Sequence, residues 1–153
     1  MREINIKKEI TEIEVDFWSV YSQIKLFPVT GRWLSVYNSH RNKILDENKK
    51  ISAKLDNLKG NQNTIISYTV NSMIKCQYFI NFHIACAHEG NADVRTRNKE
   101  MMIVYSDEFI HLISVVKSSS DKFATDIASI SEKLESIICY ITRRKKNMKH
   151  NNI

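Results

Sequence analysis

Apolar residues recur along most of the chain at alternating intervals of three and four positions. In the first stretch, about residues 4 to 27, these positions are Ile6, Ile10, Ile13, Phe17, Val20, Ile24 and Phe27. Because an α-helix has about 3.6 residues per turn, this spacing places all of them on one helix face. Pro28 and Gly31 follow at once, so we expect the helix to end there.

Three further stretches show the same spacing and predict three more helices. The second ends at Gly60, and its stripe comprises Leu34, Tyr37, Arg41, Ile44, Asn48, Ile51, Leu55 and Leu58. Another follows a polar connector expected at residues 91–98, and it carries Met102, Tyr105, Phe109, Leu112 and Val116. The last follows a break at residues 118–121, and its stripe is Phe123, Ile127, Ile130, Leu134, Ile137 and Ile141.

The remaining stretch, about residues 62 to 89, is apolar on nearly every face. One stripe consists of Ile66, Val70, Met73, Ile80 and Ile84, and other faces carry Ile65, Tyr68, Ile74, Cys76, Tyr78, Phe79 and Phe82. Between Asn61 and His88, Lys75 is the only charged residue apart from histidines. A helix that is apolar all round is usually buried, so we predict a core helix that the others surround.

These patterns predict an all-α protein, an antiparallel bundle of about five long helices with stripes like those of coiled coils. The chain has three glycines and one proline, whereas average usage gives about ten and about seven at this length. Few turn-forming residues mean few and long elements. Two segments rich in Ile, Tyr, Phe and Val, residues 68–84 and 101–116, could instead form strands. Neither segment alternates apolar and polar residues with a period of two, as a strand would. We expect one bundle domain over residues 1–142 and a basic tail over 143–153.

The net charge of +6 is concentrated at the C-terminal end of the sequence. Five cations lie within seven residues there: Arg143, Arg144, Lys145, Lys146 and Lys149. The other 18 basic residues nearly balance the 17 acidic ones. The tail is therefore a candidate site for polyanions such as nucleic acid or an anionic surface. The structural alternative is that these cations complement the negative end of a helix dipole.

The second stretch is the candidate surface for a protein partner. Five apolar stripes exceed what a four-helix core needs, so one of them is available to a second copy or to a partner helix. Asn48 is polar on an apolar stripe, which in coiled coils specifies register. The candidate contact residues are Leu34, Tyr37, Ile44, Asn48, Ile51 and Leu55. The alternative is that all five stripes pack within the chain.

No motif names a reaction. His83, Cys86 and His88 form H-x-x-C-x-H, but one helix cannot direct all three side chains to one metal, so no metal site is predicted. Arg97 and Asn98 begin the Arg-polar-x₄-His motif of some helical ribonucleases, but Ile103 stands at the histidine position. Phosphate-binding glycine loops and nucleophile elbows do not occur. We therefore predict no catalytic residues and no cofactor.

Cysteine usage and hydropathy bear on location. The three cysteines show no disulfide spacing and lie in apolar sequence, which is typical of buried free thiols in a reducing compartment. The first residues form no apolar leader, so we predict a cytoplasmic protein, with signal-independent export left open. Residues 61–88 hold many polar side chains, so a buried helix fits better than a membrane span.

Our functional prediction is a non-catalytic interaction or regulatory protein that acts through self-association or by binding a partner helix. A second hypothesis is a nucleic-acid-associated protein that uses the basic tail. A third is a membrane-inserting protein that uses the weakly charged helix at 62–89.

Overall fold

The computed structural model describes residues 5–27, 34–87 and 89–151, without the side chains of 34–36 and 144–151. The described chain contains five helices and no strand, so the all-α prediction is confirmed. The helices are α1 (Ile6–Leu26), α2 (Leu34–Leu55), α3 (Thr64–Cys86), α4 (Ala92–Lys117) and α5 (Ala124–Asn151).

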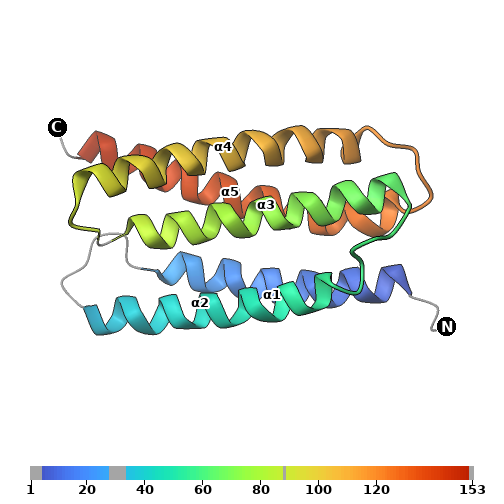
Figure 1. Cartoon of the computed structure of the whole chain (residues 1–153), viewed down its shortest axis with the longest axis horizontal. Helices are drawn as coiled ribbons and strands as arrows, with labels where there is room; N and C mark the ends of the chain where they lie inside the picture. The colour runs from blue at the N-terminus through green and yellow to red at the C-terminus, as the bar shows by residue number, and fades with distance from the viewer. Residues whose placement is uncertain (1–4, 28–33, 88, 152–153) are drawn as a thin grey trace.

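Consecutive helices run antiparallel, so α1, α3 and α5 point in the same direction (Figure 1). Four of the helices form a closed bundle in which α1 contacts α2 and α5, while α3 contacts α2 and α5. The fifth, α4, packs on the outside against α3 and α5. As a result, α5 has two parallel neighbours, α1 and α3, although no two consecutive helices are parallel.

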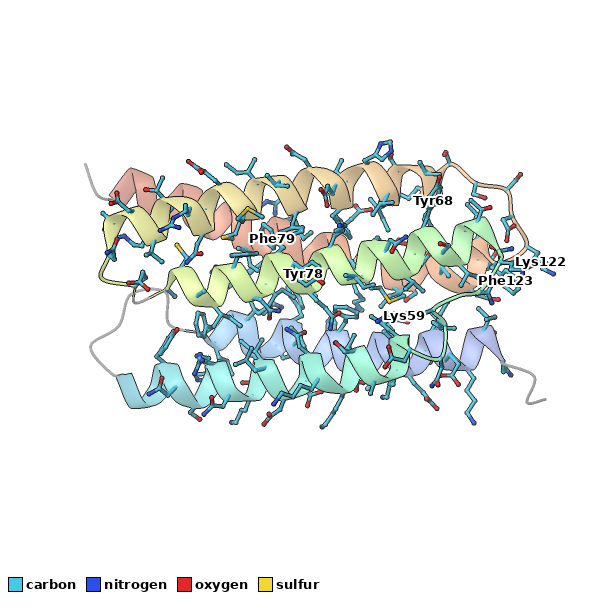
Figure 2. The ribbon with its side chains drawn as sticks, viewed as in Figure 1. Lys59, Tyr68, Tyr78, Phe79, Lys122 and Phe123 are labelled. Atoms are coloured by element: carbon cyan, nitrogen blue, oxygen red, sulfur yellow. The ribbon has the colours of Figure 1, made fainter. Side chains whose placement is uncertain are left out.

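The apolar stripes of α1 and α5 are the most completely buried. In α1 the stripe from Ile10 to Phe27 is at most 1% exposed. In α5 five stripe residues are fully buried, namely Ile127, Ile130, Leu134, Ile137 and Ile141. The sixth expected member, Phe123, precedes the helix and is partly buried at the end of the bundle, beside Lys122 (Figure 2). The three-four spacing thus marked the side chains that fill the core.

The position of α3 differs from the prediction. It is not surrounded by the other four helices, because α1 lies at the opposite corner of the bundle and contacts α2 and α5 instead. Its extra apolar faces have another cause: α3 packs against three helices, including the external α4. Tyr78 remains 44% exposed, whereas its neighbour Phe79 is buried (Figure 2).

The predicted connector at residues 91–98 is also wrong, because α4 begins at Ala92. The Asn91 side chain accepts hydrogen bonds from the backbone N–H groups of Asp93 and Val94, which satisfies two donors at the helix start. The first turns of α4 are polar because they face solvent. Because these turns are polar, their sequence resembles that of a loop.

The turn between α2 and α3 contains Gly60, where the sequence predicted a break. Gly60 has a φ of +84°, a left-handed conformation that glycine adopts without steric cost. Asn63 then caps α3 by accepting hydrogen bonds from the backbone N–H groups of Ile65 and Ile66. The expected break at Pro28 and Gly31 lies outside the described residues, although α1 does end at Leu26.

Replacing a fully buried stripe residue should destabilise the bundle. Ile51 is 0% exposed and Ile103 is 62% exposed, so the same substitution tests core against surface. We expect Ile51→Ala to lower the free energy of unfolding by about 2–5 kcal/mol, and Ile103→Ala to change it by less than about 0.5 kcal/mol. Urea unfolding followed by circular dichroism measures both. Equal decreases in the two variants would contradict this arrangement of the helices.

Candidate functional site

The predicted partner surface on α2 lies in the core of the chain itself. Ile44, Ile51 and Leu55 are at most 1% exposed, Asn48 is 6% exposed and Tyr37 is 9% exposed. The side chain of Leu34 is outside the described residues. The candidates that the structure describes are thus buried between α2 and its neighbours in the same chain, and they do not form an outward-facing surface. Periodicity reports that a stripe is buried but cannot distinguish a partner within the chain from one outside it.

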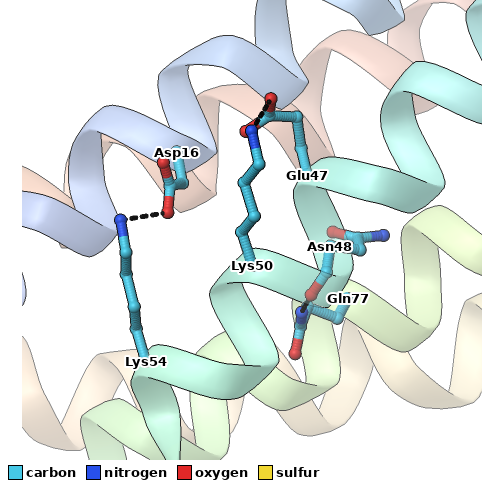
Figure 3. Close-up of polar contacts among 6 residues, drawn as sticks. All are labelled: Asp16, Glu47, Asn48, Lys50, Lys54 and Gln77. Carbon is cyan, nitrogen blue, oxygen red and sulfur yellow. Dashed lines mark hydrogen bonds and ion pairs between the residues drawn. The ribbon is translucent and has the colours of Figure 1, made fainter.

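Asn48 takes part in a polar layer between α2 and α3. Its Nδ2 donates to Asn81 Oδ1 at 3.1 Å. Gln77 Nε2 donates to the backbone carbonyl oxygen of Asn48 at 3.0 Å (Figure 3). Gln77 Nε2 also lies 3.3 Å from Ser52 Oγ. The Asn48–Asn81 hydrogen bond favours the observed alignment of α2 and α3, as polar residues do on the stripes of coiled coils.

A second internal contact joins α1 to α2. Lys54 Nζ lies 2.6 Å from Asp16 Oδ2, and the Asp16 side chain is mostly buried (Figure 3). Lys54 offsets the desolvation of this carboxylate. Asp16 is therefore a structural residue of the hairpin, and it is not available as a surface acid.

The interface of α1 and α5 brings aromatic rings and cations together at the surface. Lys133 Nζ lies 3.5 Å from the centre of the Trp18 ring, and Lys25 Nζ lies 4.1 Å from the centre of the Tyr21 ring. The Trp18 and Tyr21 ring centres are 5.7 Å apart, and Tyr21 meets Tyr140 edge-on at 6.0 Å. We call these five residues the aromatic–cationic strip.

The direction of the two helices explains the strip. Because α1 and α5 run parallel, equivalent positions along them meet in order: Glu14 accepts a hydrogen bond from Ser129, Trp18 meets Lys133, and Tyr21 meets Tyr140. Trp18 is 48% exposed even with Lys133 over its ring. Our reading of the sequence missed the strip, because the Trp18–Lys133 and Tyr21–Tyr140 contacts join segments more than a hundred residues apart.

The predicted basic tail is continuous with this strip. The helical backbone of α5 extends to Asn151, so residues 143–151 prolong the helix that carries Tyr140. Arg143 is exposed. The side chains of Arg144, Lys145, Lys146 and Lys149 lie outside the described residues. The basic segment therefore begins directly beyond the strip, on the same helix.

The H-x-x-C-x-H residues are used for packing where they are described. The His83 ring is buried and meets the Phe27 ring at 5.7 Å, and the buried Cys86 thiol lies 3.9 Å from the Arg95 carbonyl oxygen. His88 is outside the described residues. Across the described chain, His, Cys, Asp and Glu side chains form no group of three suited to a metal ion.

Shifted pKa values occur at buried or paired side chains away from the strip. Burial raises the pKa of the Cys76 thiol far above its ordinary value, which keeps it protonated and unreactive. Burial likewise raises the pKa of Tyr37, whose hydroxyl donates to the Ile84 carbonyl oxygen at 3.0 Å. The hydrogen bond to Glu108 raises the pKa of Lys75.

Comparison with protein-family models, with curated proteins and with solved structures finds no match to this chain. None of the helices, as far as the chain is described, combines the length and apolar character that crossing a bilayer requires.

Thiol accessibility should separate the three cysteines. All are free, but Cys139 is exposed whereas Cys76 and Cys86 are buried, which corrects the expectation that all three are buried. We expect a thiol reagent such as Ellman's reagent to modify one cysteine per native chain rapidly and all three after denaturation. Cys139→Ser should abolish the fast phase. A fast phase that persists in this variant would contradict the burial of Cys76 or Cys86.

Proposed function

We propose that the protein is a non-catalytic binding protein that contacts nucleic acid through the aromatic–cationic strip and the basic end of α5. The observation that carries the proposal is the juxtaposition of Trp18, Tyr21 and Tyr140 with Lys25 and Lys133. Cations attract phosphates and exposed rings offer surfaces to bases, a combination that nucleic-acid-binding grooves use.

The lysines of the strip are available to a phosphate. Within the described part of the chain, neither Lys25 nor Lys133 forms an ion pair with an acidic side chain. Both lie over aromatic rings instead, a contact that holds an ammonium group near the surface without neutralising it. A phosphate can therefore bind either lysine without first displacing a carboxylate.

Compensation of the helix dipole explains the position of Lys25 but not that of Lys133. Lys25 lies in the last turn of α1, where a cation complements the dipole. Lys133 lies 18 residues before the end of α5 at Asn151, a distance of about 27 Å. Dipole effects fall off within one turn, so Lys133 has no such role. Its position favours a ligand that extends along the helix from the basic segment.

Removing the cations should weaken binding in proportion to the phosphates that they neutralise. We expect a variant with Gln at Arg143, Arg144, Lys145, Lys146 and Lys149 to bind a fluorescent oligonucleotide more weakly. The slope of log K against log salt should become shallower by about 0.7 for each single-strand phosphate that is no longer neutralised. Fluorescence anisotropy across a salt series measures the affinity and its slope.

Two exposed lysines on α2 supply the control. Lys43→Gln with Lys49→Gln removes positive charge from exposed positions on a helix that carries no strip residue, and we expect the salt slope to stay near that of the unaltered protein. A polyanion without bases, such as heparin, tests charge alone. Unchanged affinity and slope in the five-residue variant would rule out the basic segment as a contact.

Self-association is the second candidate function, and a different surface supports it. The external helix α4 exposes large apolar side chains: Ile103 is 62% exposed, Val104 is 44% exposed and Ile110 is 55% exposed. Ile103 and Ile110 are seven residues apart, two turns along one face. This face replaces the α2 stripe as the candidate contact with a second copy.

Charged substitutions on α4 should reduce any oligomer to a monomer. If two copies pair through this face, Ile103→Lys with Ile110→Lys places cations in the contact, and the solution mass should fall to the 17.9 kDa of one chain. Multi-angle light scattering measures the mass. Val15→Lys with Leu26→Lys, two exposed positions on α1, is the matched control. An oligomer that survives the α4 variant would exclude this surface.

A further inference from the structure

We infer that the aromatic–cationic strip selects single-stranded nucleic acid, with unpaired bases stacking on Trp18 and Tyr140. This inference rests on the proposed function and names the form of nucleic acid that the site takes. The distinction from a duplex follows from the rings. Charge alone attracts single and double strands alike, whereas a ring can stack only on a base whose face is free.

The rings of the strip are accessible at one surface. Trp18 is 48% exposed and Tyr21 and Tyr140 are partly buried, so each is anchored in the bundle on one side. Tyr140 meets Tyr21 through a near-perpendicular contact, with planes at 86°, so the two rings do not cover each other face to face. Lys133 lies over one face of the Trp18 indole, so a base stacks on that face when the lysine side chain turns away to a phosphate.

The cations lie where the backbone of such a strand would run. Lys133 contacts the Trp18 ring and Lys25 contacts the Tyr21 ring, so each lysine is within reach of a phosphate attached to a stacked nucleoside. From Tyr140 the same helix continues into the basic segment beginning at Arg143. The strip is thus followed on the same helix by the basic residues that begin at Arg143, and a flexible single strand can follow the helix from one to the other.

The test compares one strand with a duplex on matched variants. The probes are a labelled oligothymidylate of about 16 nucleotides, the upper end of the site sizes of one OB-fold, and a blunt duplex of equal length. We expect Trp18→Leu to weaken oligothymidylate binding roughly tenfold, within the range that removal of a stacking ring produces, and to leave duplex binding unchanged. Trp18→Phe should restore most of the affinity, because it restores an aromatic face. Tyr140→Leu should weaken oligothymidylate binding in the same way.

Tyr78→Leu is the matched control, because Tyr78 is 44% exposed on α3, outside the strip (Figure 2). We expect it to bind both probes like the unaltered protein, and circular dichroism checks that each variant is folded. Equal binding of both probes, with no effect of Trp18→Leu or Tyr140→Leu, would overturn the stacking inference and leave charge-driven binding standing. Failure to bind either probe at low salt would overturn the proposed function itself.

Discussion

The packing of α1 against α5 is the contact on which the rest of the structure depends. These helices are the first and last in the chain, and their association closes the four-helix bundle. Both contribute stripes that are almost completely buried. Each large aliphatic side chain removed from water contributes about 1.5–3 kcal/mol, so the buried stripes of these two helices add substantially to the driving force for folding. Without it, the α1–α2 hairpin would be attached to α3 mainly through α2.

The α2–α3 contact favours one alignment of these two helices more than it adds buried apolar surface. It contains Asn48, Gln77 and Asn81, and hydrogen bonds join Asn48 to the other two across the helices. Such a layer stabilises less than an equal area of aliphatic packing, but it disfavours other registers. The stripes of α1 and α5 thus contribute much of the apolar burial, and the α2–α3 contact contributes hydrogen bonds that favour one alignment.

The same closure places the candidate functional site at the surface. Parallel packing of α1 and α5 leaves a row of side chains along the edge of their contact, too peripheral to enter the core. Trp18, Tyr21 and Tyr140 occupy this row with Lys25 and Lys133. Trp18 is 48% exposed, and Lys133 lies over its ring. This exposed, cation-covered indole is the reason for proposing a binding role.

The sequence by itself determined the helices, because three-four spacing follows directly from helix geometry. It identified the stripes of α1 and α5, the break at Gly60 and the polar position of Asn48. It misjudged the start of α4, since a capped, solvent-facing turn has the composition of a loop. Tertiary structure alone decided which stripe faced which neighbour. It therefore buried the α2 stripe proposed for a partner, placed α4 outside the bundle, and brought Trp18 to Lys133. The spacing of apolar residues predicts that a side chain is buried. It does not predict which residue packs against it, because that depends on contacts between segments distant in the chain.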